Sequence, residues 1–123
     1  MIKVKKKGDT KTLINSIVKG IQEKKGLEIV ILDLSQLNST ICDYFVICHG
    51  NSRTHTVALA DSIEEEVKKS YGYFPRRREG FSNGEWVLLD YMDVVVHVFQ
   101  EPMRTFYKLE ALWADAPRTF INT

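Results

Sequence analysis

Two carboxylates and one imidazole interrupt an otherwise apolar stretch late in the chain. Asp90 and Asp93 lie between two runs of strand-forming residues, 86–89 and 94–99, and His97 lies inside the second run. The residues that join the runs are about the right number for a hairpin connection. Continuous apolar runs, in place of clean alternation, predict strands that are covered on both faces. Carboxylates at the tip of such a strand pair either cap a hairpin or form a functional site.

Paired carboxylates could hold the metal ions of a nucleotidyltransferase, which lie about 3.5–4 Å apart. Ligands for such ions come from alternate positions of one strand, because alternate side chains share a face. Asp90 and Asp93 are separated by the expected turn, and no third acidic residue alternates with them along the strand. The spacing therefore does not favour catalysis, and we expect neither a metal nor another cofactor.

A short turn after an earlier apolar run offers a second candidate site. Gly50-Asn51-Ser52 follows a strand pattern and precedes a helical one. Free N–H groups at a helix start can hold an anion or a phosphate. The same residues also fit a simple strand-to-helix turn with Ser52 or Asn51 as the N-cap, which is the interpretation we favour.

The cysteines and histidines do not have the spacing of standard zinc ligands. We interpret them as core residues with reduced thiols, as is typical of a cytoplasmic protein. Nucleophilic catalysis by Cys48 with His97 stays an alternative, and it would require a lowered thiol pKa and direct contact. The residues of these two types are Cys42, Cys48, His49, His55 and His97.

Three consecutive arginines, 76–78, lie between Phe74 and Phe81. Arginines beside aromatic rings can bind single-stranded RNA through phosphate contacts and base stacking. Charged residues are equally suited to an edge strand, where they prevent pairing with another sheet. We favour the edge strand, because Pro75 excludes a central position in a sheet.

The composition indicates one globular domain of ordinary character. The chain has 123 residues, of which 44% are hydrophobic and 27% charged, and its formal net charge is +1. Such a balance creates no overall field that would attract nucleic acid or a membrane. No apolar run is long enough to span a membrane, and no apolar signal core follows the basic residues near the start. We therefore expect a cytoplasmic location.

Hydrophobic periodicity predicts an α+β fold, in which helices pack on a mixed sheet of about five strands in the order α-β-β-α-β-β-β-α. The first helix covers about 10–25 and stops at Gly26. We expect a basic flexible arm at 1–9, the domain at 10–116 and a short tail at 117–123. A last helix at about 103–114 has an apolar side of Met103, Phe106, Leu109, Leu112 and Trp113.

Several blocks of the chain carry a specific combination of residues. They are Asp43-Tyr44-Phe45-Val46-Ile47-Cys48, Gly50-Asn51-Ser52, Glu79-Gly80, Trp86-Val87-Leu88-Leu89-Asp90-Tyr91, Asp93-Val94-Val95-Val96-His97-Val98-Phe99 and the aromatic residues of the last helix. Together they resemble the ribosomal silencing factor family, which is also called the Iojap-like family. The resemblance covers nearly the whole domain, and it implies a nucleotidyltransferase-like fold without catalysis, and therefore no enzyme.

For function, the resemblance implies binding to the large ribosomal subunit through its protein L-fourteen, at the surface that meets the small subunit. Binding there would block subunit joining and repress translation when nutrients are short. The resemblance also suggests a homodimer, with no membrane partner and no free small-molecule substrate. Two departures are that Met92 stands where the family usually has glycine, and that His49 replaces a small residue.

We expect the binding surface on the hairpin and its neighbours. Carboxylates can bind the Arg and Lys side chains of a basic ribosomal protein, and aromatic rings supply a desolvated anchor. The alternative is that Trp86 is a core residue and both aspartates cap the hairpin. For His97, which alternates with Val96 and Val98, we predict a hydrogen-bonded structural or interface role. The predicted partner-binding residues are Glu79, Trp86, Asp90, Tyr91, Asp93 and His97.

Overall fold

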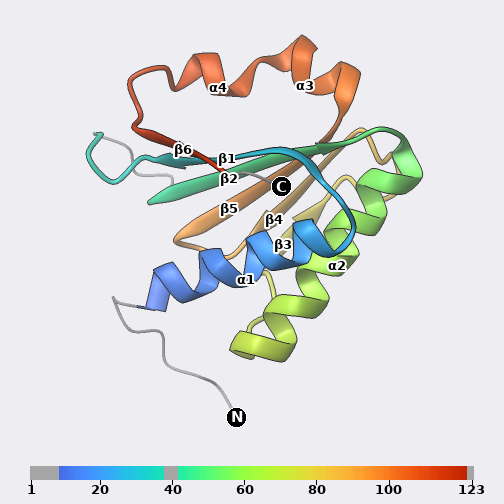
Figure 1. Ribbon diagram of the computed structural model, residues 1–123, viewed down its shortest axis with the longest axis horizontal. Coiled ribbons are helices and arrows are strands. Elements are labelled where there is room, and N and C mark those ends of the chain that lie inside the picture. The colour runs from blue at the N-terminus through green and yellow to red at the C-terminus, as the bar shows by residue number, and fades with distance from the viewer. Residues whose placement is uncertain (1–8, 38–41, 122–123) are drawn as a thin grey trace.

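A computed structural model describes residues 9–37 and 42–121 of the chain. Its helices are α1 (Asp9–Glu23), α2 (Arg53–Tyr71), α3 (Glu101–Tyr107) and α4 (Leu109–Leu112). Its strands are β1 (Leu27–Asp33), β2 (Tyr44–Gly50), β3 (Arg77–Glu79), β4 (Trp86–Asp90), β5 (Val94–Gln100) and β6 (Arg118–Phe120). The strands form one mixed sheet in the order β3-β4-β5-β2-β1-β6, with α1 and α2 on one face and α3 and α4 on the other (Figure 1).

The central hairpin predicted from the two apolar runs is confirmed. Strands β4 and β5 are antiparallel, with Trp86 opposite Phe99 and Asp90 opposite Val95. On its other edge, β5 pairs in parallel with β2 along the length of both strands. Every residue of β5 before Gln100 is buried. The continuous apolar run therefore reflects a strand that has neighbours on both edges and on both faces.

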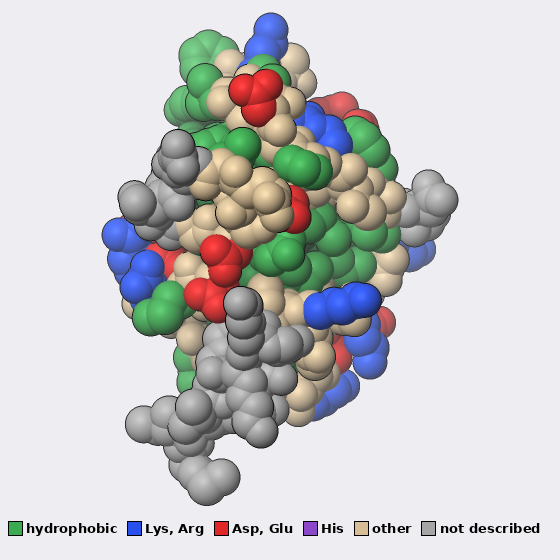
Figure 2. Space-filling view, turned by 90° about the vertical axis from the view of Figure 1, so that its left-hand side faces the viewer, with side chains coloured by type: hydrophobic (Ala, Val, Ile, Leu, Met, Phe, Trp, Pro, Cys, Tyr) green, Lys and Arg blue, Asp and Glu red, His purple; other side chains and the backbone are tan. Residues whose placement is uncertain are grey.

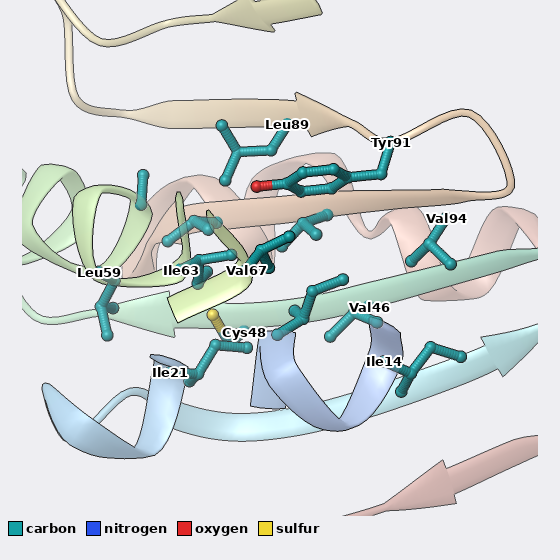
Figure 3. Close-up of a cluster of buried hydrophobic side chains, with 14 of the residues drawn as sticks. Ile14, Ile21, Val46, Cys48, Leu59, Ile63, Val67, Leu89, Tyr91 and Val94 are labelled. Atoms are coloured by element: carbon teal, nitrogen blue, oxygen red, sulfur yellow. The ribbon is translucent and has the colours of Figure 1, made fainter. Parts of the chain in front are cut away.

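Alternation of side chains along the strands divides the core into two clusters, one on each face of the sheet. On the face of α1 and α2, Leu89 of β4 packs in one cluster with Ile63 of α2 (Figure 3). On the opposite face, Phe99 of β5 packs in a second cluster with Leu109 of α4. Neighbouring residues on one strand therefore face different surroundings, which decides the position of each candidate site residue.

The boundaries of α1 and α2 agree with the predictions in position, although the end of α1 differs in mechanism. The hydroxyl of Ser52 accepts a hydrogen bond of 3.0 Å from the His55 N–H, which confirms Ser52 as the N-cap of α2. After α1, Lys25 and not Gly26 adopts the left-handed conformation, with φ of 59°. Gly26 is needed for close approach, because a Cβ there would lie 2.3 Å from Ile21 Cγ2. None of the described helices has the length and apolar character needed to cross a membrane.

The prediction of one continuous last helix is wrong. Lys108 adopts a left-handed conformation with φ of 49°, and this turn separates α3 from α4. The change of direction leaves Phe106 and Leu112 each 74% exposed, although the helical pattern places both on the buried side. Leu109 is buried as expected.

The prediction of five strands followed by a short tail at 117–123 also needs correction. Residues Arg118–Phe120 form a sixth strand, β6, which pairs antiparallel with β1 at the edge of the sheet. The N–H of Asp33 donates to the Pro117 carbonyl at 2.8 Å, which joins the two segments before the strand pairing begins. The predicted arm at 1–9 lies outside the described residues except for Asp9, at which α1 begins.

Candidate functional site

Four of the six predicted partner-binding residues have side chains on the sheet face that carries α3 and α4. Trp86 and Asp90 occupy alternating positions of β4, together with Leu88 between them. His97 of β5 is directly opposite Leu88, and Glu79 of β3 is opposite the same leucine from the other side. Directly paired residues of antiparallel strands share a face, so the four side chains are neighbours.

The indole of Trp86 holds the imidazole of His97 in place. Trp86 Nε1 donates a hydrogen bond of 3.1 Å to His97 Nδ1, and the indole also lies 4.8 Å from the rings of Phe99 and Tyr107, centroid to centroid. His97 is 5% exposed, and burial lowers the pKa of its imidazole to about 3. The ring is therefore neutral at pH 7, with a hydrogen bond of the kind that we predicted.

Asp90 is a buried carboxylate that is already engaged within the protein. One oxygen, Oδ1, accepts from the Met92 N–H at 2.8 Å, which closes the hairpin turn. The other, Oδ2, accepts from Arg76 Nε at 3.1 Å and lies 3.9 Å from Arg77 Nε. Asp90 therefore caps the hairpin, as the alternative interpretation has it, and it holds two arginines beside the turn.

The sequence reasoning did not assign these two arginines to the hairpin site. Arg76 and Arg77 border a groove of about 440 Å³, whose other walls include Phe45, Leu88 and His97. The prediction of an edge strand is correct for Arg77, which lies in β3, and the pairing of the two arginines with Asp90 follows from the strand register. Neither the order of strands nor their register is visible in the arginine triplet itself.

Tyr91 is not part of this face. The Tyr91 ring turns into the cluster on the α1 and α2 face of the sheet, beside Leu89 (Figure 3). Burial raises the pKa of the Tyr91 hydroxyl, which is enclosed there. Asp93 is half-buried in the turn, where its carbonyl accepts hydrogen bonds from the N–H groups of Asp43 and Tyr44. The structure therefore separates Tyr91 from Trp86 and His97, and it places Asp93 in the hairpin turn.

The Gly50-Asn51-Ser52 turn is occupied by side chains of the protein itself. The Asn51 N–H donates to His55 Nδ1 at 3.0 Å, and His55 Nε2 lies 2.7 Å from the Lys24 carbonyl oxygen. A Cβ at Gly50 would lie 3.0 Å from both His55 Nδ1 and the Thr56 nitrogen. The start of α2 is thus a packed turn with a Ser52 cap, in agreement with the interpretation that we favoured.

Strand geometry overturns the alternative of a Cys48–His97 nucleophile. Cys48 is opposite Val98 in the parallel β2–β5 pair, so its thiol lies on the face away from His97. Burial raises the pKa of the Cys48 thiol to about 12, which opposes formation of a thiolate. Within residues 9–37 and 42–121, no three His, Cys, Asp or Glu side chains are placed to hold a metal ion together.

The end of the molecule at which β2 and β5 begin combines apolar and charged surface. Figure 2 shows hydrophobic side chains near the middle of this end, with acidic side chains beside them and Lys or Arg toward the margins. Met92, at the tip of the hairpin, is 55% exposed.

Comparisons with known proteins agree on one family. The sequence model of the family described as ribosomal silencing factor during starvation matches residues 7–123. The chain is 41% identical over 105 residues to a protein of Halalkalibacterium halodurans named ribosomal silencing factor RsfS, covering 85% of this chain and 88% of that protein. It is 39% identical over 107 residues to the protein of the same name from Bacillus subtilis, covering 87% and 89%.

A solved structure supports the same relationship. A crystal structure of a Chromobacterium violaceum protein superposes with a TM-score of 0.80 at 34% sequence identity, covering 85% of each chain. This agreement confirms the α+β architecture with a mixed sheet. It does not test the expected likeness to nucleotidyltransferases, which stays a prediction.

Proposed function

This chain belongs to the family of ribosomal silencing factors, and from that premise we propose that it binds the large ribosomal subunit and blocks joining of the small subunit. The observation that carries the proposal is the family match over residues 7–123, which includes the hairpin and both helical layers. The protein L-fourteen of the large subunit is the proposed contact, and repression of translation under nutrient limitation is the proposed outcome. Such a factor would act in the cytoplasm, with ribosomes.

We place the binding surface around the Trp86–His97 pair and the hairpin. Trp86 is half-buried and lies against Phe99 and Tyr107, as expected of an aromatic anchor whose remaining surface is desolvated on binding. Glu79 is exposed on β3, where it can form the rim of an interface. Asp93 lies at the turn, so we assign it to the same rim.

The direct test is co-sedimentation with purified large subunits. Truncating an anchor residue should cost at least about 2 kcal/mol, a thirty-fold loss of affinity, so Trp86→Ala should weaken binding to that extent. Phe120→Ala removes an exposed ring from the far edge of the sheet and should bind like the parent protein. Circular dichroism checks that both variants are folded. A folded Trp86→Ala protein with the affinity of the parent would place the surface elsewhere, with 76–78 as the next candidate.

We also propose self-association into a homodimer. Several large apolar side chains are mostly exposed on the described surface, namely Phe74, Met92, Phe106, Leu112 and Phe120. Burial of such side chains between two copies would remove apolar area from water. Analytical ultracentrifugation at tens of micromolar should show a dimer, and a monomer at that concentration would contradict the proposal.

The family is one of regulatory factors, and we propose no enzymatic activity for this chain. The packed turn at the start of α2 and the capped Asp90 leave the two catalytic candidates engaged in structure. A nucleotide with magnesium should therefore not raise the melting temperature. A ligand present at a hundred times its Kd would stabilise the protein by about 2.7 kcal/mol, so a shift of that size would contradict this proposal.

A further inference from the structure

One buried hydrogen-bond donor next to the groove has no acceptor among residues 9–37 and 42–121. His97 Nε2 is enclosed and makes no hydrogen bond within the described residues. Its ring contacts Phe45 edge to face with centroids 4.5 Å apart, but such a contact is weaker than a hydrogen bond. Buried polar groups are nearly always satisfied by protein or by ordered water, so the acceptor for this atom comes from outside the described residues.

The contact with Trp86 determines what this atom offers. An indole N–H can only donate, so Nδ1 of His97 must be the acceptor in the bond of 3.1 Å. The neutral ring then carries its single proton on Nε2. The unmatched group is therefore an N–H donor, and a partner must supply an oxygen that accepts from it.

The residues around the donor indicate which kind of chemical group carries that oxygen. The groove that His97 lines has apolar walls from Phe45, Leu88 and Val95. Arg76 and Arg77 border it, with side chains that are 55% and 64% exposed, and the Asp90 carboxylate beside them lines it as well, so the groove holds two cationic groups and one anionic group. A guanidinium has five N–H donors, and the contact of Arg76 with Asp90 uses its Nε, so donors remain for a second anion.

We infer that the groove receives a carboxylate on an apolar stem from a protein partner, an acidic side chain whose oxygen accepts from His97 Nε2 beside Arg76 and Arg77. The apolar walls suit the methylene groups of such a side chain, whereas a nucleic-acid phosphate would bring its hydrated sugar neighbours against Phe45 and Leu88. The inference rests on the proposed function only for the identity of the partner. The inference also adds to the binding surface predicted from the sequence. That prediction pairs carboxylates of this chain with basic groups of the partner, whereas the arginines around Asp90 would bind an acidic group of the partner.

Nuclear magnetic resonance of protein with ¹⁵N-labelled histidine and arginine tests the groove without ribosomes. The probes are isobutyrate, isobutylamine and inorganic phosphate. Isobutyrate should shift the Nε2–H signal of His97 and the Nε–H signals of Arg76 and Arg77, while isobutylamine should not. A shift with phosphate alone would overturn the inference in favour of a nucleic-acid backbone, and no shift with any probe would overturn it outright.

Two substitutions at His97 separate the donor from the rest of the ring. In His97→Asn, the amide oxygen can replace Nδ1 as acceptor for Trp86, but no N–H replaces the Nε2 position. In His97→Gln, an amide N–H reaches the Nε2 position. Since a hydrogen bond to a charged group is lost, His97→Asn should bind isobutyrate about ten-fold more weakly or worse, and His97→Gln should recover part of the affinity.

The arginines provide a second set of variants, and circular dichroism checks that each is folded, because the buried Asp90 carboxylate loses its charged partners. Arg76→Gln with Arg77→Gln should weaken isobutyrate binding, and Arg53→Gln, an exposed arginine paired with Glu85, should not. Equal binding of isobutyrate by all variants would overturn the inference.

Co-sedimentation with large subunits then identifies the partner. If isobutyrate binds to the groove but the parent protein does not sediment with large subunits, the inference about the groove is retained and the proposed function fails. If the parent sediments and His97→Asn sediments equally well, the groove has no part in that binding and the inference fails.

Discussion

At the scale of single residues, Met92 stores strain in the hairpin turn. Its φ is +80°, a left-handed conformation that a residue with a Cβ adopts at a cost of about 1–2 kcal/mol. The Asp90 carboxylate maintains this conformation by accepting the Met92 N–H at 2.8 Å. The Met92 side chain is mostly exposed, so little packing offsets the cost. A glycine here would relieve the strain.

Met92→Gly should therefore stabilise the protein, because glycine adopts positive φ freely. We expect a net gain of about 0.5–1 kcal/mol, since the greater entropy of glycine in the unfolded chain offsets part of the relief. Urea denaturation measures the change. Met92→Ala keeps a Cβ and is the matched control. A glycine variant no more stable than the alanine variant would show that the turn is unstrained.

His97 makes a second residue-scale prediction, on the dependence of stability on pH. Its pKa is about 3 in the folded protein and 6.5 in the unfolded chain, so between these values the unfolded chain binds more protons. Stability is then complete above pH 6.5 and falls by about 1.4 kcal/mol per pH unit as pH decreases toward 3. Burial lowers the pKa of His49 as well, which adds a loss in the same direction.

Comparison with His97→Asn isolates the contribution of this residue, because asparagine does not titrate. The free energy of unfolding, measured by urea denaturation at several pH values, should fall less steeply for the variant below pH 6.5. Parallel curves for the two proteins would mean that His97 titrates normally in the folded state.

At the scale of elements, Arg104 fastens the α3–α4 segment to the sheet. Its guanidinium makes paired hydrogen bonds of 3.1 and 2.9 Å to the Glu110 carboxylate, across the turn at Lys108. It also donates to the Glu28 carbonyl at 2.8 Å and lies 3.0 Å from His49 Nδ1. One nearly buried side chain thus joins α3, α4, β1 and β2.

Arg104→Met should destabilise the protein by about 2–3 kcal/mol, because it leaves the Glu110 carboxylate and the Glu28 carbonyl without their donor. Hydrogen exchange should show the increase in opening mainly in α3 and α4. Arg53→Gln breaks an exposed pair with Glu85 and should change stability by less than about 1 kcal/mol. Similar losses for the two variants would indicate that Arg104 has no special structural role.

At the scale of the whole molecule, residues distant in sequence complete the sheet. Strand β6 covers the edge of β1, and Arg118 Nη2 donates to the Trp113 carbonyl at 3.0 Å. The last described segment therefore joins the sheet edge to the end of the α3–α4 layer. This arrangement also covers an edge that could otherwise pair with another chain.

A chain that ends at Pro117 should lose about 2–4 kcal/mol of stability, because several backbone hydrogen bonds of β1 lose their partners. Amide exchange should accelerate in β1 and stay slow in β5, which keeps β4 and β2 on its edges. Undiminished stability and unchanged exchange in β1 would show that β6 contributes nothing to the sheet.

Sequence alone determined the central hairpin, the order of the first eight elements and a cap at Ser52 or Asn51, and the structure identifies Ser52 as that cap. These features depend on alternation, propensity and capping, which act between residues that are close in the chain. The sequence also indicated that β5 is buried on both faces. Val94, Val96 and Val98 point to one face and Val95 and Phe99 to the other, so both faces of the strand are apolar. The turn at Lys108 and strand β6 were missed because tertiary contacts override local propensity there.

The composition of the candidate site was decided by the tertiary structure. Asp90 meets Arg76 because β3 pairs with β4, and Tyr91 leaves the site because the next position of an extended chain faces the opposite side. The donor on His97 is unmatched only in the context of Trp86, Phe45 and the groove between strands. Each of these contacts depends on the pairing register between segments far apart in sequence. A shift of that register by one residue would move every side chain of the strand to the opposite face of the sheet.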